Sequence, residues 1–310
     1  MGTWARTGPV VVEVDGSAEG LRVVDYACLE AIRSGAELVL AAPYPAHSSF
    51  SPMTPGYLPK PPAGLADDDL RAAVAHVRRQ VGYELPLNAV SKEGSRLKVL
   101  PELARQARLL VVGRSRARGP HRLVAAQANL FLAARTGCPL VVVPMSWKPS
   151  AADRNVAVGV DGTSLSLEAV EFAFRTAADR DGDLTVVHAE PAPQRVPADD
   201  ELESSWVRRA DVTVAETLAG WADEYPEVRV TRFLTARPVV AALMQESQQV
   251  GLIVLGAHAG PLPIGDPVAR RAVAAMTCPV AIVPHHITVA EREAHGREVQ
   301  IGTDVVKSTY

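Results

Sequence analysis

Several classes of protein are excluded by what the sequence lacks. Its 310 residues include three cysteines, too few for the disulfide framework of a secreted protein. The 32 basic and 35 acidic side chains give a formal net charge of −3, without the positive excess of a general nucleic-acid binder. No apolar run approaches the roughly 18–20 residues that span a bilayer, and no hydrophobic signal segment opens the chain. We therefore expect a cytoplasmic protein that binds neither nucleic acid nor membranes.

The common sequence signatures of catalysis are also missing. The chain has no G-x-x-x-x-G-K-[ST] phosphate loop and no G-x-G-x-x-G dinucleotide turn, and it has no G-x-S-x-G nucleophile elbow. Its eight histidines are scattered, and the adjacent His285 and His286 cannot share a helical face as metal ligands usually do. We therefore predict no metal site, and the sequence identifies no catalytic residue.

What the sequence does contain is an internal repeat. Three motifs occur once in each half, in the same order: PVVVEVDGS (9–17) and NVAVGVDGT (155–163), LLVVG (109–113) and LIVLG (252–256), CPLVVVP (138–144) and CPVAIVP (278–284). The offset falls from 146 residues between Asp15 and Asp161 to 140 between Cys138 and Cys278, so the second copy is slightly shorter. Such ordered agreement indicates duplication. We predict copy 1 (residues 1–146), a linker (147–154), copy 2 (155–285) and a polar tail (286–310).

Each copy alternates short β-branched runs with helical patterns. Runs such as VVVEV and LLVVG are apolar at nearly every position, which is typical of parallel strands covered on both faces by helices. We therefore predict an α/β fold in which each copy is a five-stranded, doubly wound, flavodoxin-like sheet of order 3-2-1-4-5. The predicted strands are 9–15, 37–42, 87–92, 109–112, 139–143, 155–161, 184–189, 228–234, 252–255 and 279–283. The predicted helices are 17–34 (capped by Ser17), 66–82 (opening on Asp67, Asp68 and Asp69), 97–107, 122–135, 164–180, 200–222, 238–249 and 266–276.

This fold predicts where a ligand would bind. In an open parallel sheet, ligands bind beyond the carboxyl ends of the strands where the strand order reverses, here between the first and fourth strands. Asp15 and Asp161 end the first strands, and Gly113 and Gly256 end the fourth. A carboxylate opposite a glycine loop suits a nucleoside phosphate. The same Asp-Gly-Ser/Thr residues equally suit a plain strand-to-helix turn, so the residues alone leave both interpretations open.

Together, VDGS, VVG and CPLVVVP resemble the universal stress protein family, here as a tandem pair over about residues 9–144 and 155–284. The resemblance implies the doubly wound sheet. It also implies ATP binding in many members, through a first-strand Asp, a second-strand Val and a loop of pattern G-x-x-G-x9-G-[S/T], whereas other members bind no nucleotide. We expect a stress-response accessory protein rather than an enzyme, with weak ATP hydrolysis kept only as a further alternative.

Copy 1 departs from that loop pattern. Gly113 matches the first glycine, but Arg116 stands at the second and Ala126 and Gln127 stand where Gly-Ser is expected. Backbone approach to phosphate favours glycine, yet arginine side chains can hold phosphate instead. The alternative is a solvated, basic surface loop. For an adenine nucleotide in copy 1, the resemblance implies contacts from Asp15 to base or ribose, from Val39 near the base, and from Gly113 and Gln127 toward phosphate. The basic loop adds Arg114 and Arg116, which we expect to face phosphate as well.

Copy 2 departs further. Gly256 is kept, but Ala259 replaces the second glycine, and Asp266 and Pro267 replace Gly-Ser. Asp266 would repel phosphate, and Pro267 has no N–H to donate. We therefore expect no triphosphate in copy 2. An uncharged nucleoside site with Asp161, Val187 and Gly256 stays open.

The last strand of each copy predicts how the copies assemble. VVVP and AIVP lie at a sheet edge in this topology, and exposed apolar edges invite pairing. The family resemblance implies pairing through that strand, so we expect the two copies to pair within the chain, with a homodimer as a further assembly. The alternative to nucleotide binding is an interaction module of the same fold that acts on an unidentified protein partner.

Overall fold

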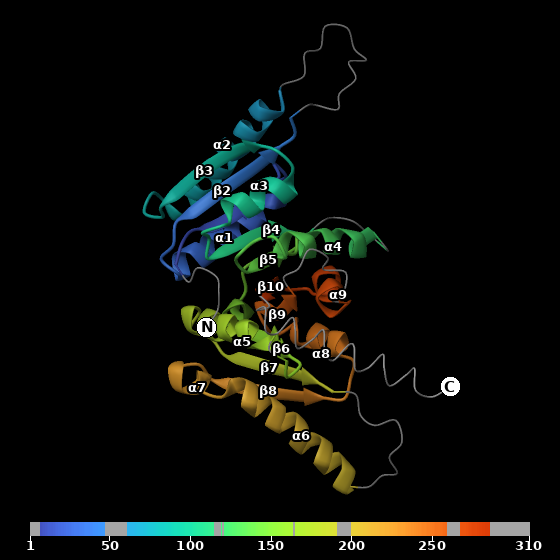
Figure 1. Cartoon of the computed structure of the whole chain (residues 1–310). Helices are drawn as coiled ribbons and strands as arrows, with labels where there is room; N and C mark the ends of the chain where they lie inside the picture. Colours follow the sequence, from blue (N-terminus) through green and yellow to red (C-terminus); the bar gives the residue numbers. More distant parts are fainter. Residues whose placement is uncertain are drawn as a thin grey trace, which may run out of the picture.

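The computed structural model describes residues 7–46, 61–114, 119, 121–163, 165–190, 200–258 and 267–285. Copy 1 occupies the upper half of Figure 1 and copy 2 the lower half. Both copies repeat the same alternation of strands and helices, because buried apolar strands alternate with amphipathic helical segments in the sequence. The elements of copy 1 are β1 (Val10–Glu13), α1 (Gly20–Arg33), β2 (Leu38–Tyr44), α2 (Pro62–Val81), β3 (Leu87–Glu93), α3 (Arg96–Leu103), β4 (Leu109–Gly113), α4 (His121–Ala133) and β5 (Leu140–Val143).

A short 3-10 helix, η1 (Ala151–Arg154), leads into copy 2. The elements of copy 2 are β6 (Val156–Val160), α5 (Leu165–Asp179), β7 (Leu184–Ala189), α6 (Asp200–Leu218), α7 (Trp221–Glu224), β8 (Val230–Thr235), α8 (Val239–Glu246), β9 (Leu252–His258), α9 (Pro267–Ala275) and β10 (Val280–His285). None of the helices in the described ranges combines the length and apolar character needed to cross a membrane.

The strands form one ten-stranded sheet of order β3-β2-β1-β4-β5-β10-β9-β6-β7-β8. All pairs within a copy are parallel, and each copy has the order 3-2-1-4-5, so the predicted fold is confirmed. The copies meet where β5 pairs antiparallel with β10, Val141 opposite Ala281. The expected pairing of the two copies within one chain is therefore present.

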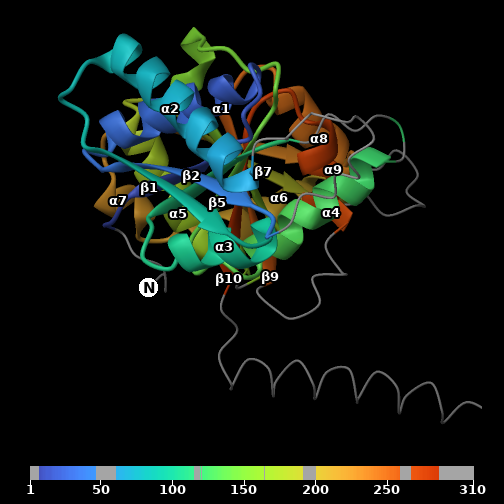
Figure 2. The same cartoon turned by 90° about the horizontal axis from the view of Figure 1, so that it is seen from above.

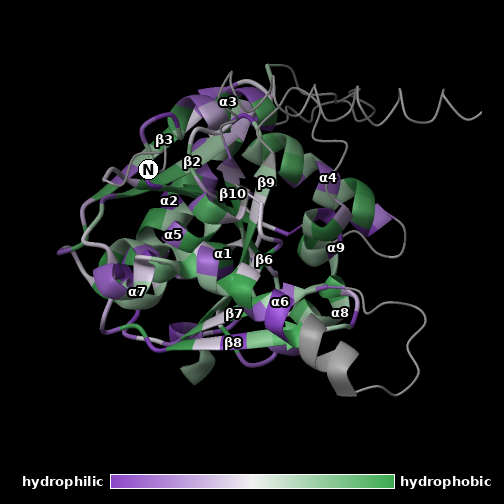
Figure 3. Ribbon diagram, turned by 60° about the horizontal axis from the view of Figure 1, so that its bottom comes forward, coloured by the Kyte–Doolittle hydropathy of each residue, from purple (hydrophilic) through white to green (hydrophobic). Residues whose placement is uncertain are grey.

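Helices cover both faces of the sheet. In copy 1, α1 and α2 lie on one face, and α3 lies on the opposite face (Figure 2). Double coverage buries the central strands: every residue of β5 and of β10 is buried, whereas the edge strands β3 and β8 keep exposed positions. Hydrophilic residues colour parts of α1, α6 and α7 purple in Figure 3. The core is thus sandwiched between the sheet and the inner helix faces.

A fully buried arginine joins the two copies. Arg180, which follows α5 and has no exposed side-chain surface, donates hydrogen bonds to the Tyr26 hydroxyl (2.7 Å) and to Glu30 Oε1 (3.0 Å) of copy 1. It also donates to the Asp153 carbonyl (2.9 Å) in η1. Trp147, in the segment predicted as a linker, is buried edge-on against Tyr26, with ring centroids 5.2 Å apart. This segment packs between the copies.

Several predicted helix ends are wrong. Regular α1 begins at Gly20, although Ser17 does accept a hydrogen bond from the Gly20 N–H (2.9 Å). Helix α2 begins at Pro62, where proline costs no helical hydrogen bond, so Asp67–Asp69 lie inside the helix and not at its start. The predicted helix 200–222 divides into α6 and α7 at Gly220, whose φ of +84° suits glycine. The predicted tail 286–310 lies outside the described residues.

Candidate functional site

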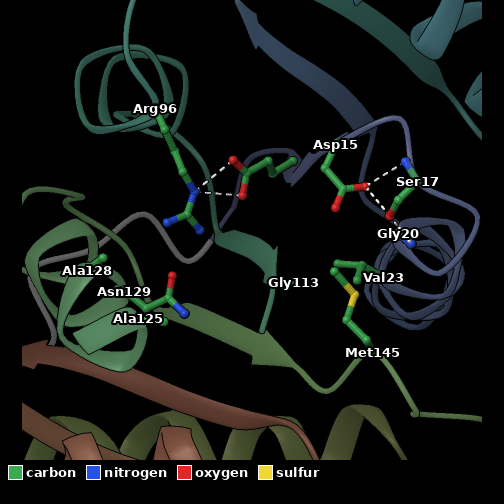
Figure 4. A pocket seen from close by; sticks show the side chains of 11 residues that line it. Asp15, Ser17, Gly20, Val23, Arg96, Gly113, Ala125, Ala128, Asn129 and Met145 are labelled. Carbon is green, nitrogen blue, oxygen red and sulfur yellow. Dashed lines mark hydrogen bonds and ion pairs between the residues drawn. The ribbon is translucent and has the colours of Figure 1, made fainter. Parts of the chain in front are cut away.

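A cavity of about 580 Å³ opens in copy 1 beyond the carboxyl ends of β1 and β4 (Figure 4). This is the point at which the strand order reverses, where open α/β sheets bind ligands. Its walls come from β1 and the following turn, α1, the start of α3, the end of β4, α4 and the segment after β5. The lining residues are Glu13, Asp15, Ser17, Gly20, Val23, Arg96, Gly113, Ala125, Ala128, Asn129 and Met145.

The turn after β1 fixes Asp15 at one wall. Asp15 Oδ1 accepts hydrogen bonds from the Ser17 backbone N–H (3.0 Å) and hydroxyl (2.7 Å). A side chain at Gly20 would place its Cβ 2.0 Å from that same oxygen, so glycine at this position lets the Asp15 carboxylate keep its place. The second oxygen, Oδ2, takes no hydrogen bond from the described residues and is available to a ligand.

An ion pair crosses the opposite wall. Arg96 Nε donates to Glu13 Oε1 (2.7 Å) and Oε2 (2.8 Å). Burial raises the pKa of Glu13 and outweighs the opposing effect of Arg96. Glu13 is the last residue of β1, and Arg96 is the first residue of α3, so the pair ties the sheet to that helix. It places a guanidinium beside the cavity.

Asn129 of α4 completes the polar lining. It is only 3% exposed, and its amide faces the cavity in Figure 4. No hydrogen bond within the described residues involves this side chain. Ala125 and Ala128 lie on the same face of the helix, and their small side chains leave the space open.

Two of the predicted copy 1 residues, Asp15 and Gly113, line this cavity. Arg116 lies outside the described residues. Gln127 is half-buried on α4 but is not part of the lining, because Ala125, Ala128 and Asn129 occupy the helix face toward the cavity.

Arg114 and Val39 lie away from the cavity. The Arg114 guanidinium donates to the Met276 carbonyl of copy 2 (2.6 Å), and burial lowers its pKa. Its predicted contact with phosphate is therefore corrected to a contact between the copies. Val39 pairs with Val11, two positions before the end of β1. It therefore lies in the middle of the sheet and not at the carboxyl ends of the strands, where the cavity opens. The register of β2 makes Val39 a wrong choice for the base contact.

Copy 2 has a smaller cavity at the equivalent place, about 170 Å³. Asp161 and Gly256 line it as predicted, whereas Val187 is fully buried in β7 and Ala189 takes the lining position. Ala259 and Asp266 lie outside the described residues, and Pro267 begins α9, where its missing N–H is tolerated.

Asp161 is held more tightly than Asp15. Its Oδ1 accepts hydrogen bonds from the Thr163 N–H (2.9 Å), the Thr163 hydroxyl (2.7 Å) and the Ser166 hydroxyl (2.8 Å). Burial acts to raise the pKa of Asp161, but these hydrogen bonds together outweigh it and hold the pKa below its ordinary value.

Leu255 explains why the second cavity is small. The residue equivalent to Glu13 is Gly159, and a Cβ there would lie 2.8 Å from Leu255 Cδ2. Leucine therefore fills the space that the glutamate side chain takes in copy 1. With the offset of 143 residues that relates Gly113 to Gly256, Val239 stands for Arg96; with the offset of 140 that relates Cys138 to Cys278, Ala269 stands for Asn129. Both residues line the smaller cavity.

Sequence reasoning missed Glu13, Arg96 and Asn129. Alignment of the two copies carried a signal for each, since the partners in copy 2 are Gly159, Val239 and Ala269. A charged residue inside an apolar strand that the other copy lacks deserves an explanation. Within the described residues, no cluster of three or more His, Cys, Asp or Glu side chains could hold a metal ion.

Fold and site together define a tandem α/β protein with a ligand-sized cavity at a strand-order reversal. The sequence model of the protein family described as "Universal stress protein family" matches residues 7–144 and 154–284 of this chain. The chain therefore belongs to the universal stress protein family.

Its relatives include universal stress proteins of Mycobacterium bovis and Mycobacterium tuberculosis, each 28% identical over 257 residues, 80% of this chain and 86% of the relative. A second protein of M. tuberculosis is 32% identical over 191 residues, 56% of this chain and 61% of the relative. Among solved structures, a universal stress protein of Archaeoglobus fulgidus has a TM-score of 0.60 and 12% identity, over 91% of this chain and 98% of that one. That structural likeness concerns the fold alone.

Proposed function

We propose that this chain is a stress-response accessory protein that binds an adenine nucleotide, with ATP as the first candidate, in the cavity of copy 1. The observation that carries the proposal is a cavity of about 580 Å³ at the strand-order reversal, with a free carboxylate oxygen on one wall and a guanidinium on the other. Binding cavities for small molecules typically measure about 300–1,000 Å³. The space in copy 1 is large enough, and that in copy 2 is too small.

Asp15 is the residue proposed to recognise the nucleoside. Its Oδ1 is engaged by Ser17, while Oδ2 remains an acceptor for an amino group or a ribose hydroxyl. Gly113, opposite Asp15, carries no side chain at the end of β4 and allows the ligand to approach the backbone. Copy 2 is proposed to bind no nucleotide, because Leu255 occupies the corresponding space.

The test is titration calorimetry of the nucleotide-stripped protein with ATP, ADP, AMP and cyclic AMP. We expect one site per chain. Asp15→Ala should abolish binding while leaving the thermal unfolding curve in place, and the matched Asp161→Ala in copy 2 should leave affinity unchanged. Equal loss in both variants would contradict the assignment to copy 1.

Absence of heat with every nucleotide, together with no thermal stabilisation at millimolar ligand, would instead favour the interaction module. Binding without turnover is the proposed activity. Incubation with ATP and Mg²⁺ should therefore release no phosphate above a blank without protein.

A further inference from the structure

The guanidinium of Arg96 has unused donors at the cavity. Its Nε is engaged by both oxygens of Glu13, whereas its two terminal nitrogens make no hydrogen bond to any described residue. Figure 4 shows that end of the side chain on the cavity side toward Asn129. A guanidinium held by one edge presents its remaining N–H groups in a fixed, planar arrangement that matches a phosphate or carboxylate.

Asn129 supplies a second and independent indication of a ligand. More than nine-tenths of this residue is buried, and its amide points into the cavity without a partner among the described residues. Buried polar side chains are nearly always hydrogen-bonded, so an unpaired one at a cavity wall is best explained by a ligand or ordered water. An amide can donate two hydrogen bonds to an anion beside Arg96.

Copy 2 lacks both groups. Val239 and Ala269 stand at the positions of Arg96 and Asn129, and Gly159 stands at the position of Glu13. The cation, its positioning carboxylate and the amide are therefore present together in the large cavity and absent together from the small one.

We infer that Arg96 and Asn129 bind the phosphate of the nucleotide in copy 1, with Glu13 positioning the guanidinium. This inference rests on the proposed function. It assigns to two side chains of α3 and α4 the role that the glycine-rich loop pattern, incomplete in this chain, assigns to backbone N–H groups. Asp15 then faces the nucleoside on the opposite wall, and the two ends of the ligand are recognised separately.

The experiment compares the affinities of AMP and adenosine, which differ only by the phosphate, by titration calorimetry on the full chain. Asn129→Ala tests the amide; alanine stands at the same place in copy 2. Glu13→Gln/Arg96→Gln tests the guanidinium without leaving a buried, unpaired carboxylate, and Glu13→Gln alone is its reference. Lys98→Gln is the matched control, because Lys98 is an exposed cation of α3 outside the cavity.

In the wild-type protein, we expect AMP to bind about tenfold more tightly than adenosine or better. Asn129→Ala and Glu13→Gln/Arg96→Gln should each weaken AMP binding by about tenfold and leave adenosine affinity within about twofold. Lys98→Gln should change neither. Thermal unfolding identifies any variant that fails to fold, and the two variants act on different helices.

Unchanged AMP affinity in both variants, with adenosine and AMP still bound, would overturn the inference and leave the proposed function intact. Equal weakening of AMP and adenosine would also overturn it, since the residues would then act on the nucleoside or on the fold. If neither compound binds the wild-type protein, the proposed function fails and the phosphate site fails with it.

Discussion

The cavities of the two copies stand at the same point of the same fold and differ in almost every polar contact. Copy 1 has an open space of about 580 Å³ with Glu13, Arg96 and Asn129 in its walls. Copy 2 has about 170 Å³, and its walls at those positions are apolar. The first-strand aspartate is common to both, yet in copy 2 three hydrogen bonds converge on one of its oxygens. A shared strand order thus fixes where a cavity forms but not what it can hold.

The residues that differ between the two cavities depend on one another. Removing only Arg96 would leave Glu13 buried without its cation, which is strongly destabilising. Copy 2 lacks both charges and fills the vacated space with Leu255. One cavity is therefore built for a polar ligand, and the other is packed as part of a core.

The largest expected effect concerns the contact that holds the unlike copies together. Arg180→Ala would leave the buried Tyr26 hydroxyl and the Asp153 carbonyl without this donor, and Glu30 with Arg33 as its remaining cation. We expect the free energy of unfolding to fall by about 3–5 kcal/mol, measured by urea denaturation. The control is Arg154→Ala, because the Arg154–Asp181 pair is highly exposed (3.5 Å, side chains 65% and 97% exposed) and should contribute little. A loss below about 1 kcal/mol for Arg180→Ala would show that the copies do not depend on this arginine.

The next effect would remove the difference between the cavities. Glu13→Gly, Arg96→Val and Val112→Leu together give copy 1 three of the residues that copy 2 has at these walls, with Val112 at the position of Leu255. The new leucine should fill the space, and we expect AMP binding to weaken by about a hundredfold or more. Circular dichroism and thermal unfolding report whether the variant folds. A folded variant that binds AMP as the wild type does would show that these walls do not form the binding site.

The smallest effect sharpens the comparison of the two aspartates. The pKa of Asp161 is lower in the folded protein than its ordinary value, so its ionised form adds stability at pH values above about 4, and this stability is lost as the pH falls through the folded-state pKa. We expect Asp161→Asn to lower the melting temperature at pH 7 by about 2 °C, with the difference shrinking toward pH 3. Ser166→Ala removes one donor to Asp161, so the loss of melting temperature caused by Asp161→Asn at pH 7 should be smaller in the Ser166→Ala background. A difference that is constant from pH 7 to pH 3 would contradict this account.

The sheet could be predicted from the sequence because buried strands are visible there as short, continuous apolar runs. Runs such as LLVVG are apolar throughout because helices cover both of their faces, and the repeat of the motifs gives the strand order twice. The residues that line the cavity form no such local pattern. Glu13 and Arg96 are 83 residues apart, and only the folded chain brings them together. Comparison of the copies position by position could have identified them.

The errors at the site have the same origin. Arg114 follows Gly113 in a basic stretch and therefore suggested phosphate, but its partner is a carbonyl 162 residues further along the chain. The sequence does not report the register of β2 against β1, and the observed pairing puts Ala41, not Val39, opposite the end of β1. Strand ends and side-chain directions depend on tertiary contacts that sequence periodicity does not report.

The antiparallel joint between β5 and β10 has an evolutionary consequence. Two identical subunits joined in this way would be related by a twofold axis, and every substitution would appear on both sides. Joining the halves in one polypeptide removes that symmetry requirement, so a change in one half is not imposed on the other. It also makes the joint intramolecular and hence insensitive to dilution. A single polypeptide with two unlike halves thus has a fixed stoichiometry of one large cavity for every two domains, an asymmetry that a homodimer of identical subunits would lack.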